Sequence, residues 1–420
     1  MKVIHLNTYD GNGGAGRACY RINSALKNEG IDSKMYTFIK LGNKTSIYSL
    51  FPTWYEKALA TLNILAERYL PVLFTKDLKL PFSLSFFGRD IHNHPAVLAA
   101  DIIHLHWINH GFLNPKGLEK LAQLGKPIVW TIHDSNTFTG GCHVRFDCQN
   151  YLESCGSCPL LKNPKAGDLS HQIWLKKEKA YVTLKPLIIS PSNWLSNAAK
   201  NSGLIKNLII KVIPNTLETD VFKPLDKKNA KDHFGINENH FVLLSGFMPS
   251  KKDAHKGIFY LIEALDLWIT QHPELKDKAT LLIFGNRETH PDLPFKLPVQ
   301  FLGTINDDEL LAKAYAAADV FLTTSLEDNL PNTVMESLAC GTPVVSFTTG
   351  GIPDMVKHLK NGYLAQYKNS DDFMKGIQWV YEHPDKEKLN ANARETVLNN
   401  FSETVVARQY IKVYQQLLNK

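Results

Sequence analysis

The chain has 420 residues, of which 44% are hydrophobic and 21% are charged. This composition excludes a disordered or fibrous protein, and the length suits two globular domains. The formal net charge of +6 suits anionic ligands or an anionic membrane surface, but without a run of Lys or Arg it does not indicate nucleic-acid binding. No signal peptide and no apolar run of membrane-spanning length is present, so we expect a cytoplasmic protein.

Short apolar runs alternate with amphipathic helical stretches along the first half of the chain. The predicted strands are Val3–Asn7, Lys34–Ile39, Asp101–His106, Pro127–Ile132, Leu187–Ser190 and Leu208–Ile213. The predicted helices are Gly14–Asn28, Pro115–Leu124, Ile173–Val182 and Trp194–Lys200. Alternation of this kind predicts a mainly parallel sheet that is covered by helices on both faces.

A turn-rich segment follows Ile213, and the alternation then starts again. The strands predicted here are Phe241–Gly246, Ala279–Phe284, Val299–Leu302, Val320–Thr323, Pro343–Phe347 and Tyr363–Gln366. The helices are Gly257–Thr270, Asp307–Ala318 and Thr333–Ala339, with three more near 371–382, 386–398 and 402–418. We therefore predict an α/β protein of two doubly wound, Rossmann-like domains, at 1–215 and 216–401, followed by a final helix within 402–420.

The segment Phe51–Phe87 differs from the rest because it combines many aromatic and aliphatic residues with scattered Lys and Arg. The spacing over Trp54–Tyr69 predicts one or two amphipathic helices. A helix that packs on the sheet is the simpler interpretation. The alternative is a surface for a bilayer or for a lipid-linked molecule, at the inner face of the plasma membrane.

A glycine-rich loop follows the first predicted strand and leads into a helix. Gly13, Gly14 and Gly16 would let the backbone turn sharply and approach a phosphate at the helix N-terminus. The loop matches the dinucleotide fingerprint only in part, because Lys40, rather than an acidic residue, follows the second strand. We expect a phosphate-facing loop, with a plain tight turn as the alternative.

A second candidate phosphate site lies between Gly246, which ends the first strand of the second half, and the helix that begins at Gly257. This loop carries Lys251, Lys252 and Lys256. Lysines at a helix N-terminus can neutralise a diphosphate without a metal ion.

An acidic segment, Ser325–Phe347, gives the strongest signal. Asp328 lies in a loop after a strand, and Glu336 lies in the next short helix, for which Asn332 is a suitable N-cap. Asp328 could bind sugar hydroxyls, and Glu336 could accept hydrogen bonds from a ribose. Gly350 and Gly351 follow the next strand and would allow close approach of a ligand.

Histidines and cysteines raise the question of metal binding. His104 and His106 share one face of a strand, where hydrogen-bonded histidines are the simpler interpretation and metal ligands the alternative. Cys142, Cys148, Cys155 and Cys158 form C-x5-C-x6-C-x2-C in a loop at 141–160. We predict a structural zinc ion here, with an iron–sulfur cluster or free thiols as alternatives.

Several of these segments, in this order, resemble the retaining GT-B glycosyltransferases of glycosyltransferase family 4. The acidic segment with its Ala-Cys-Gly-Thr-Pro-Val-Val ending resembles the family's E-x7-E signature. Weaker similarities over residues 1 to about 360 are Gly13-Gly14, Asp101–Trp107, Pro191–Trp194, Val212–Asn215, His255–Gly257 and Gly350-Gly351.

The resemblance implies two domains facing a cleft, acceptor-binding first and nucleotide-sugar-binding second, with the final helix crossing back onto the first. It implies that His133, in Trp130–Asp134, lies near the transferred sugar. Lys256, helped by Lys251, would bind the donor phosphates. Asp328 would bind the sugar with the backbone at Asn329 and Leu330, and Glu336 would bind the nucleotide ribose.

Two features depart from the family pattern. The first acidic position is Asp328 rather than Glu, although Glu327 lies beside it. The Arg that the family commonly carries shortly before Lys256 is missing, so Lys251 or Lys252 would substitute without the fork of a guanidinium group. No catalytic metal is expected. The resemblance favours UDP over GDP in the donor, retention of configuration, and a glycan or lipid-linked acceptor in bacterial polysaccharide assembly. The alternatives are a nucleotide-dependent epimerase or dehydrogenase, and a non-catalytic zinc-bearing scaffold.

Overall fold

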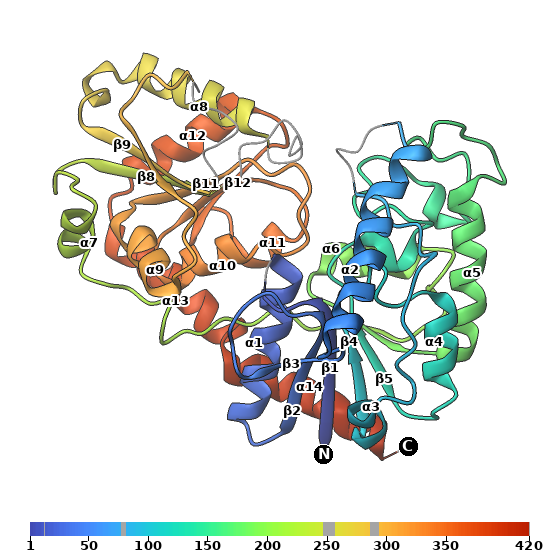
Figure 1. Cartoon of the computed structure of the whole chain (residues 1–420). Helices are drawn as coiled ribbons and strands as arrows, with labels where there is room; N and C mark the ends of the chain where they lie inside the picture. The colour runs from blue at the N-terminus through green and yellow to red at the C-terminus, as the bar shows by residue number, and fades with distance from the viewer. Residues whose placement is uncertain (12, 77–80, 247–256, 286–293, 420) are drawn as a thin grey trace. The chain divides into compact units, whose positions relative to one another are not determined.

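A computed structural model describes residues 1–11, 13–76, 81–246, 257–285 and 294–419. The chain divides into two compact units (Figure 1). The first unit comprises Met1–Thr216 and Glu403–Lys420, and the second comprises Leu217–Ser402.

The first unit is built on a seven-stranded sheet in the order β3-β2-β1-β4-β5-β6-β7, in which every pair is parallel. Its strands are β1 (Lys2–Tyr9), β2 (Asp32–Ile39), β3 (Ile47–Ser49), β4 (Ile102–Leu105), β5 (Ile128–Thr131), β6 (Leu187–Ser190) and β7 (Ile210–Val212). The predicted doubly wound sheet is confirmed. The edge strand β3 was not predicted, because three residues are too few to show a periodicity.

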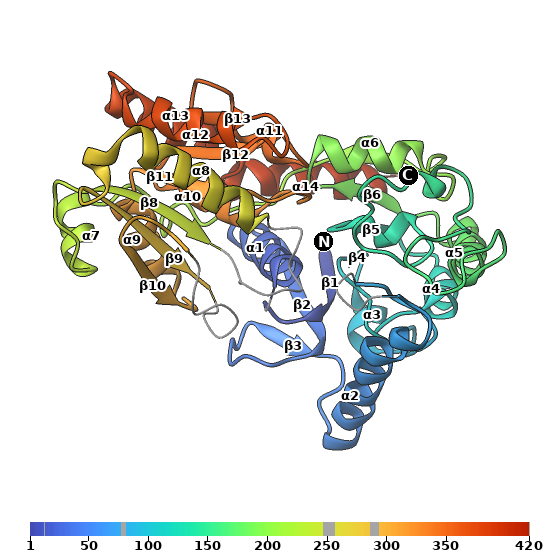
Figure 2. The ribbon, with the colours of Figure 1, turned by 90° about the horizontal axis from the view of Figure 1, so that it is seen from above.

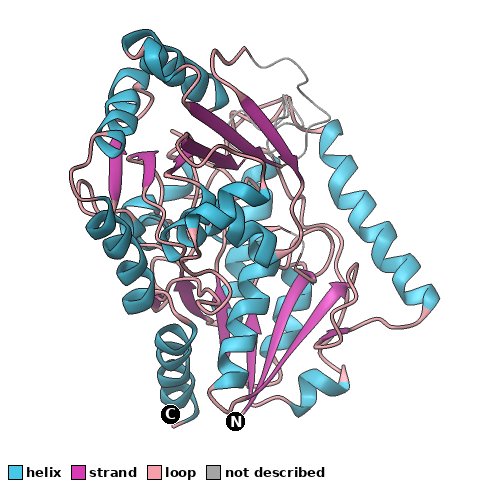
Figure 3. Ribbon diagram, turned by 90° about the vertical axis from the view of Figure 1, so that its left-hand side faces the viewer, coloured by secondary structure: helices cyan, strands magenta, loops and turns pink. Residues whose placement is uncertain are grey.

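Helices pack against both faces of this sheet. Figure 3 distinguishes the helices from the strands by colour. The helices of this unit are α1 (Gly14–Asn28), α2 (Trp54–Tyr69), α3 (Pro95–Ala99), α4 (Pro115–Ala122), α5 (Leu169–Leu184), α6 (Asn193–Asn201) and α14 (Glu403–Leu418). Short 3-10 turns lie at Leu70–Leu73, Ser135–Phe138 and Asn150–Leu152.

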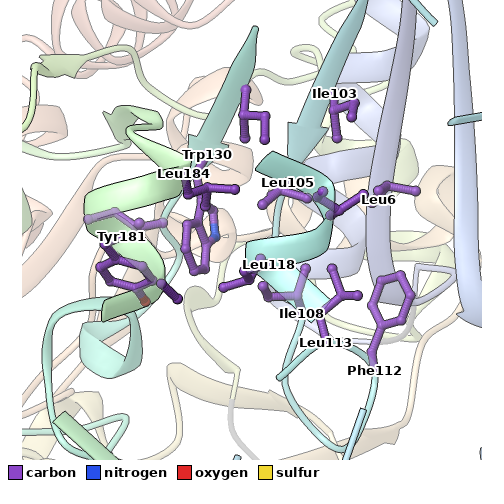
Figure 4. Close-up of a cluster of buried hydrophobic side chains, with 14 of the residues drawn as sticks. Leu6, Ile103, Leu105, Ile108, Phe112, Leu113, Leu118, Trp130, Tyr181 and Leu184 are labelled. Carbon is purple, nitrogen blue, oxygen red and sulfur yellow. The ribbon is translucent and has the colours of Figure 1, made fainter. Parts of the chain in front are cut away.

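Successive side chains of a strand point to opposite faces of the sheet, so each central strand contributes to a buried cluster on either face. Leu6, Ile103 and Leu105 pack with Leu118 of α4 in one buried cluster (Figure 4). In the same cluster, the Trp130 ring meets the Tyr181 ring edge-on, with 5.5 Å between their centroids.

The opposite face of the sheet packs against α1 and α14. Val3 and Ile102 contact Ile22 of α1 and Tyr410 of α14 in a second buried cluster. The final helix of the chain is therefore part of the core of the first unit (Figure 2).

The second unit holds a six-stranded, fully parallel sheet in the order β10-β9-β8-β11-β12-β13. Its strands are β8 (Phe241–Gly246), β9 (Ala279–Phe284), β10 (Val299–Gly303), β11 (Val320–Thr323), β12 (Val344–Phe347) and β13 (Gly362–Ala365). Its helices are α7 (Lys227–His233), α8 (Ile258–Gln271), α9 (Asp308–Ala317), α10 (Asn332–Ala339), α11 (Ile352–Met355), α12 (Ser370–Tyr381) and α13 (Lys386–Asn400), with a 3-10 turn at Pro273–Leu275.

Two clusters again cover the two faces of the sheet. Leu261 of α8 and Phe373 of α12 pack on one face, while Tyr315 of α9, Met335 of α10 and Val397 of α13 pack on the other. The predicted second doubly wound sheet is confirmed.

The contribution of α14 to the first unit can be measured by substitution. Tyr410 is fully buried, and its hydroxyl lies 3.1 Å from the Thr131 hydroxyl. We predict that Tyr410→Ala lowers the free energy of unfolding in urea by about 3–5 kcal/mol, because it empties a packed site. Arg408→Ala is the control on the same helix, since the Arg408 side chain is 70% exposed and its ion pair with Glu29 is a surface pair. A loss below about 1 kcal/mol in Tyr410→Ala would contradict this role for α14.

Candidate active site

The strand orders place a topological switch point in each sheet. In the second unit, β8 is followed along the chain by its neighbour β9 on one side, whereas β11 is followed by its neighbour β12 on the other side. Open parallel sheets bind ligands outside the carboxyl ends of the strands at such a point. The loops after β8 and β11 carry the predicted lysines and Asp328. The first unit has its switch point between β1 and β4.

The loops after β11 and β12 are locked together by their backbones. The N–H of Gly351 donates to the carbonyl of Asp328 at 3.1 Å, and the Thr349 hydroxyl donates to the carbonyl of Leu326 at 2.8 Å. A Cβ on Gly350, whose φ is +55°, would lie 1.8 Å from the Asp328 carbonyl oxygen. Gly350 is thus required by a backbone contact that holds Asp328 in place. The Asp328 side chain is half-buried, as is Asn329, whereas Leu330 is buried.

Glu336 lies in α10 and is 1% exposed. Its Oε2 accepts a hydrogen bond from the Tyr315 hydroxyl at 3.2 Å. The expectation that Asn332 caps this helix is wrong, because α10 begins at Asn332 and its N-cap is Pro331, whose fixed φ suits a helix start.

The predicted phosphate-binding lysines Lys251, Lys252 and Lys256 lie outside the described residues. The residues on either side of this loop, Gly246 and Gly257, belong to the described part of the chain. A Cβ on Gly257, with φ +61°, would lie 2.3 Å from the Thr324 carbonyl oxygen, and a Cβ on Gly246 would lie 2.1 Å from the Phe284 ring. Gly257 is the N-cap of α8. The chain on either side of the lysines is therefore held at the carboxyl ends of β8 and β11.

The glycine loop of the first unit follows β1. Gly11 and Gly13 have φ of +115° and +81°, and Gly13 is the N-cap of α1. A Cβ on Gly16 would lie 2.8 Å from the Gly11 nitrogen, whereas nothing lies within 4 Å of a Cβ on Gly14. Gly16 is therefore required where the start of α1 approaches Gly11, and the phosphate-facing role of this loop stays a prediction.

A chain of three histidines runs from the core of the first unit to the end of β5. His5 Nδ1 lies 2.9 Å from His106 Nε2, and His106 Nδ1 lies 3.2 Å from His133 Nε2. Burial lowers the pKa of His5 to about 3 and that of His133 to about 4. The rings are therefore neutral at pH 7, and each can donate through one nitrogen and accept through the other.

His104 does not join this chain. Its two nitrogens lie 2.7 Å from the Tyr414 hydroxyl and 2.8 Å from the Thr131 hydroxyl. Among the described residues, a close group of three potential metal ligands is formed by His5, Cys19 and His106. His106 is hydrogen-bonded through both nitrogens within the chain of histidines, which accounts for its place in that group without an ion.

Asp134, next to His133, has three hydrogen-bonding partners. Its Oδ2 accepts from Trp107 Nε1 at 2.7 Å and lies 2.7 Å from His143 Nδ1, while its Oδ1 accepts from the Asn136 N–H at 2.8 Å. Burial alone would raise the pKa of Asp134, but His143 and these hydrogen bonds lower it overall. The Asp134 carboxylate therefore holds together the Trp107 indole after β4, the His143 imidazole and the turn after β5.

The four loop cysteines, Cys142, Cys148, Cys155 and Cys158, form no disulfide and line one cavity. Burial raises the pKa of Cys142 to about 12 and that of Cys155 to about 11.

Three residues of this region received no role from the sequence: His5, Trp107 and Asp134. His5 could have been found from the predicted topology, because β1 and β4 are neighbours and His5 pairs with His104 in register.

The lowered pKa values of the buried histidines allow a prediction of how the free energy of unfolding depends on pH. Their pKa values in the folded protein lie below the ordinary value of about 6.5, so the unfolded chain binds more protons between pH 6.5 and about 4. The stability they give is complete above pH 6.5 and is lost as the pH falls through this window, by up to about 1.4 kcal/mol per pH unit for each histidine.

Urea unfolding between pH 8 and pH 4.5 measures this slope. We expect His5→Gln to reduce it by about one proton, with His233→Gln, at an exposed histidine, as the matched control. A stability that does not change between pH 7 and pH 5 would contradict the neutral buried cluster.

Comparison with known proteins identifies the family. Residues 240–383 match the family model described as glycosyl transferases group 1. An uncharacterized glycosyltransferase of Methanocaldococcus jannaschii is 30% identical over 332 residues, which cover 75% of each chain. The N,N'-diacetylbacillosaminyl-diphospho-undecaprenol alpha-1,3-N-acetylgalactosaminyltransferase of Campylobacter jejuni is 26% identical over 231 residues, covering 52% of this chain and 57% of the relative.

Solved structures support the same fold. HepE of Anabaena, determined in complex with UDP, has a TM-score of 0.66 at 17% identity and covers 99% of this chain and 100% of its own. A sucrose-phosphate synthase of Thermosynechococcus elongatus has a TM-score of 0.61 at 17% identity and covers all of both chains. With two doubly wound parallel sheets and these relatives, the chain belongs to the glycosyltransferases of the two-domain GT-B type.

Proposed function

We propose that this enzyme transfers a hexosyl unit from a nucleoside-diphosphate sugar, with UDP favoured over GDP, and retains the anomeric configuration as in glycosyltransferase family 4. The observation that carries the proposal is the backbone lock between the loops after β11 and β12. It fixes Asp328 at the switch point of the second unit, beside the helix that bears Glu336. The UDP complex of HepE supports a nucleotide at a fold of this kind.

In the proposed donor site, charged side chains bind the diphosphate, and hydrogen-bonding groups bind the sugar and the ribose. Lys256 and Lys251 would neutralise the diphosphate, with Gly246 and Gly257 bounding their loop. Asp328 and the backbone at Asn329 and Leu330 would bind the sugar hydroxyls, and Gly350 and Gly351 leave no side chain in the way. Glu336 would accept from the ribose hydroxyls while it keeps the Tyr315 hydrogen bond.

Transfer passes through an oxocarbenium-like state as the bond from the sugar C1 to the phosphate oxygen breaks. The new bond forms between C1 and the acceptor oxygen on the same face, and the acceptor proton moves to the departing phosphate oxygen. Lys256 and the N-terminus of α8 would stabilise the charge on that phosphate. His133, which is neutral at pH 7 because its pKa is about 4, would hydrogen-bond the transferred sugar and not act as a cation.

The dehydrogenase alternative is disfavoured because the acidic residue that would bind the ribose of NAD is missing. Lys40 follows β2 where an NAD site has an acidic residue, and its Nζ donates to the Ile47 carbonyl at 2.9 Å.

Substitutions in the second unit test the donor site. We predict that Lys256→Ala lowers kcat at least about ten-fold, because the departing phosphate loses a cation, and that Glu336→Gln weakens donor binding by about ten-fold, since a charge-assisted hydrogen bond is lost. Transfer and hydrolysis assays with a panel of UDP- and GDP-sugars measure both. Lys313→Ala, at an exposed lysine of α9, is the control. Unchanged turnover in Lys256→Ala would remove it from the mechanism.

The acceptor is proposed to be a glycan or a lipid-linked sugar in bacterial polysaccharide assembly, met at a membrane surface. No described helix is long and apolar enough to cross a bilayer. The helix α2, however, exposes an apolar stripe: Tyr55, Leu59, Leu62, Leu65 and Tyr69 are between 44% and 60% exposed, and Trp54 is 81% exposed. The stripe continues through Val72, Leu73 and Phe74, and Figure 2 shows α2 at the periphery of the first unit.

The opposite side of α2 is anchored to the protein. The Glu67 carboxylate is 1% exposed and accepts hydrogen bonds from the backbone N–H groups of residues 84–87, at 2.7–3.1 Å. An amphipathic helix that presents apolar residues with flanking Lys57 and Arg68, both exposed, suits the interface of an anionic bilayer.

Vesicle flotation tests this contact. We predict that the enzyme floats with vesicles of 30% anionic lipid, about ten-fold more than with neutral vesicles, and that the double substitution Leu62→Glu, Leu65→Glu abolishes flotation by placing charge on the apolar stripe. The control is Val182→Glu, at a residue of α5 that is 66% exposed. Equal flotation of all three proteins would exclude α2 as the contact.

A further inference from the structure

The loop between Cys142 and Cys158 closes around a small cavity of about 20 Å³. All four cysteines line it, together with Phe82, Tyr151 and Ser170. This volume holds about one water-sized sphere. A space of this size suits one metal ion held by four side chains.

The four cysteine side chains line this space. Among the described residues, no three of these sulfurs all lie within 4.8 Å of each other. Zinc–sulfur bonds of about 2.3 Å in a tetrahedron place the sulfurs about 3.8 Å apart. Binding of one ion would therefore draw the cysteine side chains closer together.

The surroundings of the cavity favour thiolates once a cation is present. The Gly140 N–H donates to Cys155 Sγ at 3.2 Å. Lys177 is 4% exposed and close enough to Cys142 and Cys155 to interact with them electrostatically. Its Nζ donates to the carbonyls of Asn136 and Thr139 at 2.5 and 3.1 Å. A buried ammonium group offsets part of the net charge of −2 that four thiolates and one Zn²⁺ carry.

The cysteine loop is hydrogen-bonded to the turn that follows His133. The N–H of Ser135 donates to the His143 carbonyl at 3.1 Å, and the Asn136 side chain donates to the Gly141 carbonyl at 2.8 Å. His143, directly after Cys142, lies 2.7 Å from the Asp134 carboxylate. Anything that fixes Cys142 therefore also fixes Asp134.

We propose that Cys142, Cys148, Cys155 and Cys158 bind one tetrahedral zinc ion, and that this ion positions Asp134 beside His133. The second part rests on the proposed role of His133 in transfer, whereas the first does not. Asp134 and His143 are positioning residues in this account, because they act through His133 and the Trp107 indole.

Elemental analysis of the full chain, purified under reducing conditions without chelator, tests the site. We expect one zinc per chain in the wild type and in Cys340→Ser, a buried cysteine of the second unit, and none in Cys148→Ser or Cys155→Ser. Replacement by Co²⁺ should give the visible absorption of a tetrahedral tetrathiolate centre. Iron with inorganic sulfide, or no metal in the wild type, would overturn the site.

Kinetics test the positioning role separately. Removal of zinc by a chelator, or Cys148→Ser, should lower kcat about ten-fold or more and leave the affinity for UDP, measured by calorimetry, unchanged. Added zinc should restore kcat to the chelated enzyme and not to the variant. Full kcat without zinc would overturn the positioning role, whereas failure of UDP to bind the wild type would instead contradict the donor site.

Discussion

The contact of Gly350 with the carbonyl of Asp328 is the constraint on which the candidate donor site depends. Parallel strands deliver their carboxyl ends to one edge of the sheet, but they do not by themselves fix the loops that follow. Here a backbone approach that no side chain could tolerate, together with the Gly351 hydrogen bond, joins two of these loops. The acidic loop is thereby set before any ligand arrives, which reduces the entropy cost of ligand binding.

In the first unit, polar side chains fix the segments that follow the strands. His5, His106 and His133 form a neutral hydrogen-bonded chain, and Asp134 ties Trp107 and His143 to the end of β5. Buried polar groups of this kind are costly unless they are satisfied, and they then define one arrangement. Both units thus hold their candidate functional residues at strand ends by contacts made before substrate binding.

Much of the fold could be predicted from the sequence because buried parallel strands have a strong signature. The apolar runs at Phe241–Gly246 and Ala279–Phe284 coincide with β8 and β9, and Trp54–Tyr69 coincides with α2. The edge strand β3 was missed because it is short. Asn332 was expected to be the N-cap of α10 because Asn is a favoured N-cap residue, whereas the helix begins at Asn332 and its N-cap is Pro331.

The candidate site could be predicted only in part. Asp328 and Glu336 were proposed from their spacing and the family resemblance. Neither the burial of Glu336 nor its bond to Tyr315 follows from a local pattern, since Tyr315 belongs to another helix. Trp107 and Asp134 were missed for the same reason, because their contact joins the ends of two strands. Contacts between distant segments need the tertiary structure.

The most direct test of the central claim is calorimetric titration of the wild-type enzyme with UDP, GDP, ADP and NAD. We predict one site per chain that binds UDP at least about ten-fold more tightly than GDP or ADP and does not bind NAD. Binding of NAD alone, or of none of the four, would contradict a nucleoside-diphosphate sugar site at the acidic loop.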